Sequence, residues 1–125
     1  RRQRQMCIRD SLPPSLTVTV NRTRIEQILV NLLVNAVDAM TSAGSITISA
    51  SERGERVVCT VTDTGVGIPP ENLDKVFEPF FSTKAEAGTG LGLPVAREIV
   101  QSYGGKLTVE SMVNRGTTFT FDLPM

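Results

Sequence analysis

The stretch DTGVG at residues 63–67 decides how this chain is interpreted, because it breaks the pattern of the strand before it. In that strand Val57, Cys59 and Val61 alternate, so Asp63 continues their inward face. A carboxylate at a buried position is costly unless it has a partner. The two glycines allow a sharp turn and a close approach of backbone. The stretch therefore indicates either an ordinary D-x-G turn or a carboxylate that recognises an amine-bearing planar ligand such as adenine.

Length and composition are those of one globular domain belonging to a longer protein. The chain has 125 residues, of which 40% are apolar and 21% charged, which suits a single core. Thirteen basic and thirteen acidic residues cancel, so no nucleic-acid partner and no anionic membrane surface is indicated. Cys7 and Cys59 form no disulfide framework, and no apolar run is long enough to span a membrane. Because the chain opens without Met, we expect residues 1–125 to be one domain of a larger protein.

The periodicities around residues 63–67 predict alternating strands and helices. Asn21 is a suitable N-cap for the long helix, and Gly44 is expected to end it. The segment 64–89 is rich in Gly and Pro, with a short helix expected from Glu71, and loops of this length are usually functional lids or disordered. Strands are predicted at 5–9, 16–20, 45–51, 56–63, 106–111 and 117–123, and helices at 22–41 and 90–103.

A polar line runs along the long predicted helix. Asn31, Asn35 and Asp38 are spaced i, i+4 and i+7, so they share one side of the helix, beside its apolar stripe. One interpretation is a solvated face that flanks a buried one. The other is a row of oxygen ligands, because amide oxygens are hard donors that suit Mg2+ together with substrate phosphates. Spacing alone leaves both interpretations open.

Two further features lie near the C-terminal half. The stretch GTGLGLP at residues 88–94 places alternating glycines directly before a helix, where free N–H groups and the helix dipole favour an anion; a plain turn is the alternative. In the last predicted strand Thr117 ends a face made by Phe119, Phe121 and Leu123. A threonine is common in strands, but with Asp63 it makes a shared polar site at two strand ends more credible.

Taken together and in this order, the motifs resemble the catalytic and ATP-binding domain of sensor histidine kinases. That family is part of a wider ATPase superfamily with gyrase, the ninety-kilodalton heat-shock chaperones and the MutL proteins. The resemblance covers residues 16–124. It is carried by QILVNLLVNA at 27–36, DTGVGIP at 63–69, FEPFFSTK at 77–84, GTGLGL at 88–93 and GTTF at 116–119.

The resemblance implies a fold and a reaction. The fold is a two-layer α/β sandwich of the Bergerat type, with a mixed sheet of about five strands and about three helices on one face. The cofactors are ATP and Mg2+, and the γ-phosphoryl group passes to a histidine. Because this chain contains no His, the acceptor is expected on a separate upstream dimerisation domain, with a response-regulator receiver domain as an indirect partner. A cytoplasmic location is expected, without contact to nucleic acid or membrane.

The resemblance also implies roles at the adenine and metal. Asp63 would accept a hydrogen bond from the adenine amine, while Gly67 and Thr117 would support the ring through backbone and water. Asn35 would ligate Mg2+, and Asn31 would assist there.

Phosphate contacts follow from the same resemblance. Lys84 would reach the phosphates and complete a catalytic set with Asn31 and Asn35. The loop between Phe81 and Gly88 would close as a lid, and its shortness, with NAVDAM at 35–40, is similar to the nitrogen-regulation-type branch. The expected nucleotide-binding residues are Asn35, Asp38, Ala39, Asp63, Gly65, Gly67, Ile68, Phe80, Thr83, Lys84, Gly88, Thr89, Gly90, Leu91, Gly92, Leu93 and Thr117.

Asn31 separates transfer from hydrolysis. In hydrolysing relatives this position is a Glu that activates water, and an Asn cannot act as a general base. Glu26 is about 140° away around the helix and is a poor substitute. Two alternatives remain, a serine-kinase anti-sigma relative, against which FEPFF at 77–81 argues, and a nucleotide-binding pseudokinase, against which the intact Asn35 and Asp63 argue.

Overall fold

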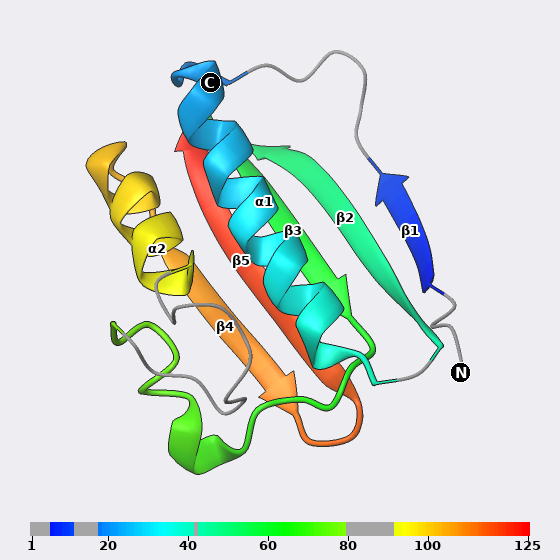
Figure 1. The fold of residues 1–125 in the computed structure, drawn as a ribbon. Helices are drawn as coiled ribbons and strands as arrows, with labels where there is room; N and C mark the ends of the chain where they lie inside the picture. Colours follow the sequence, from blue (N-terminus) through cyan, green and yellow to red (C-terminus); the bar gives the residue numbers. More distant parts are fainter. Residues whose placement is uncertain (1–5, 12–17, 42, 80–91) are drawn as a thin grey trace.

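The fold is a mixed sheet covered on one face by two helices (Figure 1). The computed structural model describes residues 6–11, 18–41, 43–79 and 92–125. The sheet has the order β1-β2-β3-β5-β4, with β1 parallel to β2 and the other pairs antiparallel. The predicted two-layer α/β fold with a mixed five-stranded sheet is confirmed. In chain order the elements are β1 (Met6–Ser11), α1 (Arg22–Ala39), β2 (Gly44–Arg53), β3 (Arg56–Asp63), the 3-10 helix η1 (Pro70–Asn72), α2 (Gly92–Ser102), β4 (Leu107–Met112) and β5 (Gly116–Pro124).

Two boundary predictions need correction. The strand expected at 16–20 is wrong over its described part, residues 18–20, where Thr19 N donates a single 2.8 Å hydrogen bond to the Pro124 carbonyl and forms no ladder. The long helix ends at Ala39, and Gly44, expected to end it, is the first residue of β2. The described residues hold two α-helices and the 3-10 helix η1, which agrees with the expected three helices, and η1 lies where a short helix was expected from Glu71.

Capping and one apolar stripe explain α1. Asn21 is the N-cap, because its Oδ1 accepts hydrogen bonds from Thr23 N at 2.9 Å and Arg24 N at 3.3 Å. The bond to Thr23 N satisfies a first-turn amide that has no backbone acceptor, while Arg24 N also donates to the Asn21 carbonyl oxygen at 3.0 Å. The buried residues Ile28, Leu32 and Ala36 recur every four positions and turn one side of α1 to the sheet. The predicted N-cap is confirmed.

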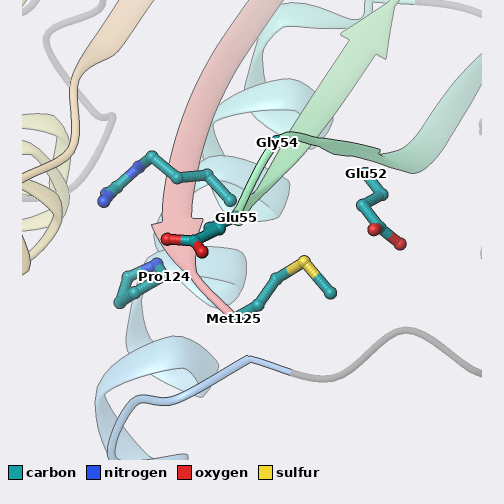
Figure 2. A pocket seen from close by; sticks show the side chains of 6 residues that line it. Glu52, Gly54, Glu55, Pro124 and Met125 are labelled. Atoms are coloured by element: carbon teal, nitrogen blue, oxygen red, sulfur yellow. The ribbon is translucent and has the colours of Figure 1, made fainter.

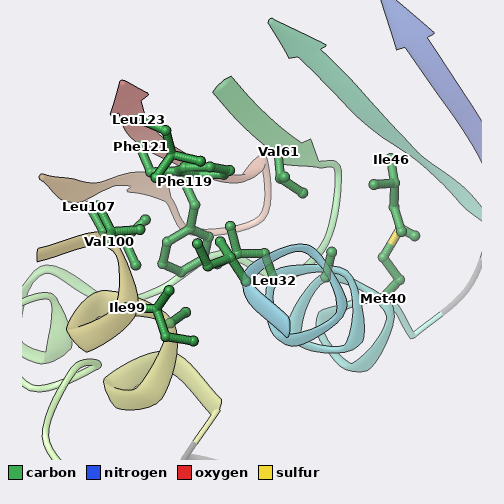
Figure 3. Packing of buried hydrophobic residues seen from close by; sticks show 13 residues of the cluster. Leu32, Met40, Ile46, Val61, Ile99, Val100, Leu107, Phe119, Phe121 and Leu123 are labelled. Atoms are coloured by element: carbon green, nitrogen blue, oxygen red, sulfur yellow. The ribbon is translucent and has the colours of Figure 1, made fainter. Parts of the chain in front are cut away.

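The core lies between the two helices and the inner face of the sheet (Figure 3). Phe119, Phe121 and Leu123 alternate along β5, so all three point toward α1 and α2. Phe77, from the loop after β3, packs edge-on against Phe119 with ring centroids 6.2 Å apart. Arg97 of α2 lies 5.3 Å from the centroid of the same Phe77 ring, a cation–π distance. The beginning of the motif at 77–84 is therefore attached to the core and to α2.

The other face of the sheet is polar, because side chains alternate along each strand. Thr62 of β3 and Thr118 of β5 share a hydrogen bond of 3.1 Å between their hydroxyls. Ser49 of β2 and Thr60 of β3 also share a hydrogen bond. The threonines of β3 therefore lie on this outer face, whereas Val57, Cys59 and Val61 lie on the inner face. Within the described residues, no helix is both long and apolar enough to cross a membrane.

Candidate functional site

Asp63 and Thr117 form the polar centre of one end of the sheet. Asp63 is the last residue of β3, and the register places Thr117 of β5 directly opposite. Asp63 is 3% exposed and Thr117 is 4% exposed. Among the described residues, they are the only polar or charged residues that are buried. Asp63 Oδ1 accepts a 2.8 Å hydrogen bond from Gly65 N. The inward parity that the sequence predicts for Asp63 and Thr117 is therefore confirmed, and both lie in one place.

Ser111, which the sequence reasoning missed, continues this polar row onto β4. It lies opposite Thr117, so the residues in register across β3, β5 and β4 are Asp63, Thr117 and Ser111. The hydroxyls of Ser111 and Thr117 are 2.8 Å apart. Residues opposite one another point to the same face of a sheet. The available signal was the same as for Asp63, since Leu107 and Val109 are apolar on the inner face and Ser111 ends it with a hydroxyl.

The loop after β3 is held between α1 and the β4–β5 turn. Val66 N donates to the Ala39 carbonyl at 3.0 Å, and Asn114 N donates to the Val66 carbonyl at 2.8 Å. A Cβ on Gly65 would lie 2.5 Å from the Ala39 oxygen. The close approach of backbone that the sequence predicts at this glycine is therefore confirmed.

Gly67 has a second, conformational reason to be glycine. Its φ is +77°, and a Cβ there would lie 2.2 Å from the Met112 carbonyl oxygen. A side chain would clash with the backbone at the end of β4, and an L-residue is also strained at this φ. Next to it, Ile68 N donates a 2.7 Å hydrogen bond to Ser111 Oγ. The loop is thereby fixed against the polar row.

The polar line on α1 faces the beginning of α2. Asn31, Asn35 and Asp38 are each partly buried. Asn31 Nδ2 donates a 3.0 Å hydrogen bond to the carbonyl oxygen of Gly92, the first residue of α2. This contact gives Asn31 a partner within the fold that a simple solvated face would lack, because Asn31 joins two helices. The other residues predicted at this end, Ala39 and Leu93, are also partly buried.

Part of the predicted site lies outside the described residues. Of the nucleotide-binding set, the structure brings together Asp63, Gly65, Gly67, Ile68 and Thr117 at the end of the sheet. Asn31 and Gly92 meet between α1 and α2. The predicted residues outside the described ranges are Phe80, Thr83, Lys84, Gly88, Thr89, Gly90 and Leu91.

The opposite end of β3 carries a different feature, an open hollow of about 630 Å³ at the β2–β3 hairpin (Figure 2). Glu52, Glu55 and Met125 are among the residues that line it. Arg56 begins β3 here and Asp63 ends it, so the hollow is separated from the polar row by the length of the strand. Arg56 forms an ion pair with Asp122 of β5, which secures this end of the sheet. The hollow therefore takes no part in the site around Asp63.

Comparison with known proteins agrees with this geometry. Residues 20–125 match the family model described as histidine kinase-, DNA gyrase B-, and HSP90-like ATPase. The sensor histidine kinase ZraS of Escherichia coli strain K12 is 45% identical over 116 residues, which cover 93% of this chain and 24% of that protein. Sporulation kinase D of Bacillus subtilis is 41% identical over 110 residues, covering 88% of this chain and 22% of the relative. The chain thus spans about a quarter of the length of these curated relatives.

Solved structures give the same result. The catalytic domain of the histidine kinase ThkA, in a nucleotide-free form, superimposes with a TM-score of 0.84 at 38% identity, covering 95% of this chain and 78% of that one. Full-length ShkA in complex with AMPPNP also has a TM-score of 0.84, at 31% identity, with 95% of this chain and 25% of that chain covered. The chain therefore belongs to the family of histidine kinase-, DNA gyrase B- and HSP90-like ATPases, and within it is homologous to the catalytic domains of sensor histidine kinases.

Proposed function

We propose that this domain binds ATP with Mg2+ and donates the γ-phosphoryl group to a histidine on a separate dimerisation domain of the same kinase. In that transfer the bond between the γ-phosphorus and its bridging oxygen breaks, a phosphorus–nitrogen bond to the histidine forms, and ADP leaves. The observation that carries the proposal is the buried Asp63 carboxylate opposite Thr117, at the end of a sheet whose fold is that of histidine kinase catalytic domains.

The adenine contact follows from the chemistry of Asp63. A carboxylate only accepts hydrogen bonds, so it suits the exocyclic amine of adenine and repels a carbonyl at the same place. Gly65 N donates a 2.8 Å hydrogen bond to this carboxylate and so orients it. A buried and oriented acceptor discriminates well, because a ligand that cannot donate offers it no hydrogen and sets a second acceptor against it. We assign Asp63 as the adenine anchor, with Thr117 beside it.

The phosphates and metal would lie toward α1 and the start of α2. The donors present fit Mg2+, since the side-chain amide of Asn35 offers an oxygen and Mg2+ usually takes only one or two protein ligands besides phosphates and water. Within the described part of the chain no group of three or more His, Cys, Asp and Glu side chains could hold a metal by itself, which agrees with binding shared with a nucleotide. Mg2+ bound there would neutralise charge on the phosphates. Asn31, held to Gly92 by its amide, keeps the two helices together around this place.

Transfer is favoured over hydrolysis because the described part of α1 presents no base where one is needed. Asn31 cannot remove a proton from water. Glu26, the nearest acidic residue before it on the helix, is exposed and lies 3.6 Å from Arg22 on the outer side. We therefore propose that catalysis rests on positioning and on stabilisation of phosphate charge, as is usual for phosphoryl transfer.

The proposed partners follow from the missing acceptor. The chain has no His, so the dimerisation domain of the whole protein would supply the acceptor, and a receiver domain of a response regulator would take the phosphoryl group from it. Because the reaction consumes ATP, we propose a cytoplasmic location. These are proposals for the whole protein, because this chain covers only about a quarter of the length of its curated relatives.

The test is to mix this domain with ATP labelled in the γ-phosphate and the dimerisation segment of the same protein. We expect label on that segment that is lost in acid and kept in base, as a phosphohistidine is. A matched reaction with Asp63→Asn should transfer far less. Label that is stable in acid would indicate a serine kinase, and ATP binding without any transfer would indicate a pseudokinase; either result would overturn the proposed reaction.

A further inference from the structure

We propose that Ser111 is a positioning residue that fixes the direction of the hydrogen bond at Thr117, and thereby helps the site to select a 6-aminopurine over a 6-oxopurine. The inference rests on the proposed binding of ATP. It begins from the row of Asp63, Thr117 and Ser111, which lie opposite one another on three adjacent strands.

The hydroxyl of Ser111 has three hydrogen-bond partners. Ile68 N lies 2.7 Å from Ser111 Oγ, the Gly116 carbonyl oxygen lies 3.0 Å from it, and Thr117 Oγ1 lies 2.8 Å from it. A serine hydroxyl offers one hydrogen to donate and two lone pairs to accept with. Three partners therefore use its whole capacity.

The chemistry of two partners determines the third bond. The Ile68 amide can only donate, so it takes one lone pair of Ser111. The Gly116 carbonyl can only accept, so it takes the single hydrogen. With the Ser111 hydrogen on the Gly116 carbonyl, one lone pair of Ser111 remains, and in this arrangement Thr117 is the donor of the 2.8 Å bond between the two hydroxyls. Thr117 Oγ1 is then left with lone pairs alone.

This direction matters because Thr117 is 4% exposed and lies opposite Asp63. Both residues then present only acceptors at this end of the sheet. The exocyclic amine of adenine carries two hydrogens and matches a pair of acceptors, directly or through water. The 6-oxo group of hypoxanthine carries none, so at this position it offers no hydrogen to Asp63 or Thr117 and sets another acceptor against them. Ser111 thus acts on selectivity without itself needing to touch the nucleotide.

Removal of the Ser111 hydroxyl would release the Thr117 hydrogen. Thr117 could then donate to a 6-oxo group, so the penalty on that ligand should fall. The Ile68 amide would also lose its acceptor, but that loss weakens both nucleotides equally. The ratio of the two affinities therefore separates a role in selectivity from a role in holding the loop.

The experiment compares two nearly isosteric variants, Ser111→Val and Ser111→Thr, by calorimetry with Mg-ATP and with Mg-inosine triphosphate on the 125-residue chain. Ser111→Val should lower the preference for ATP about 3- to 10-fold, the worth of one ordinary hydrogen bond. Ser111→Thr has the same size as Ser111→Val but keeps the hydroxyl, so it should keep the parent ratio of the two affinities. Thr117→Val should lower the ratio as well, and the double variant should lower it no further. Thr108→Val, on the same strand with an exposed side chain, is the control.

Each outcome decides the matter. If Ser111→Val keeps the parent ratio, or binds neither nucleotide, the proposal is overturned while the proposed function stands. If the parent chain does not bind Mg-ATP at all, the proposed function fails first. Should Ser111→Val not fold, as judged by its melting curve, the smaller Ser111→Ala takes its place with the same expected ratio.

Discussion

The side-chain amide of Asn31 donates a 3.0 Å hydrogen bond to the carbonyl oxygen of Gly92, and so joins α1 to the first residue of α2 across 61 positions of sequence. Both residues belong to the predicted phosphate and metal end of the site. The bond holds the N-terminus of α2, where free amides and the helix dipole favour an anion, against the polar line of α1. One side chain thereby connects the architecture of the two helices to the proposed chemistry.

Asn31→Ala should lower the free energy of unfolding by about 1 kcal/mol, because one hydrogen bond between the helices is lost. Asn31→Asp should cost more, since a carboxylate cannot donate and would face the Gly92 carbonyl. Urea unfolding measures both. Gln27→Ala, exposed one turn earlier on α1, serves as control and should change stability by less than about 0.5 kcal/mol. Equal effects of Asn31→Ala and Gln27→Ala would show that the bond contributes nothing.

Asp63→Ala should abolish measurable ATP binding, because it removes the proposed acceptor for the adenine amine and also the acceptor of Gly65 N. Asp63→Asn keeps an oxygen for Gly65 but sets an amide against the ligand, and should weaken binding at least about tenfold, the worth of a charged hydrogen bond. Calorimetry with Mg-ATP measures the affinity. Asp74→Asn removes the same charge from an exposed residue and should bind like the parent. Near-parental affinity of Asp63→Ala would refute the adenine assignment.

Asn35→Ala should remove most of the dependence of nucleotide affinity on Mg2+, because it deletes the proposed side-chain ligand. The measurement is ATP affinity with Mg2+ and with a chelator, for parent and variant. Val34→Ala, next to it on α1 with a side chain 53% exposed, is the control and should retain the parental dependence. An unaltered Mg2+ effect in Asn35→Ala would place the metal on other groups.

Gly67→Ala and Gly54→Ala separate conformational strain from steric clash. Both glycines have positive φ, +77° and +62°, but a Cβ on Gly54 meets nothing within 4 Å, while on Gly67 it would lie 2.2 Å from the Met112 oxygen. Gly54→Ala should therefore cost about 1–2 kcal/mol for its φ alone. Gly67→Ala should cost about 1–3 kcal/mol more, from overpacking. Thermal and urea unfolding measure the difference, and equal costs would mean that the loop moves away from β4 easily.

Burial raises the pKa of the Cys59 thiol from 9.0 to about 11. The unfolded chain therefore loses this proton near pH 9 and the folded chain only near pH 11. The contribution to stability is fully present below pH 9 and is lost as the pH rises to 11. We expect a steeper fall in the free energy of unfolding over this range for the parent than for Cys59→Ala. Parallel curves would show that the thiol titrates alike in both states. In the folded Cys7→Ser variant, alkylation of Cys59 should be slow below pH 9, because little of the thiol is then in the reactive thiolate form.

Most of the sheet and the family could be predicted from local patterns in the sequence. Alternation along β3 and β5 placed Asp63 and Thr117 on the inner face, because a strand has a period of two and only one side faces the helices. The hairpin at Gly54 and the N-cap Asn21 also followed from local chemistry. The strand expected at 16–20 did not form over its described part, because Thr19 makes one bond to the end of β5 in place of a ladder, a choice that local alternation cannot reveal.

Which polar groups contact one another depends on how the helices and strands pack together. Asn31 contacts Gly92 and Ser111 contacts Ile68 through the packing of elements that are distant in the sequence. Ser111 contacts Gly116 and Thr117 through the register of β4 against β5. A side chain's parity tells which face it occupies, but the direction of its hydrogen bond depends on what the opposing partners can donate or accept. The sequence therefore predicted Asp63 as the centre of the proposed site, while the register of β4 against β5 added Ser111 to it.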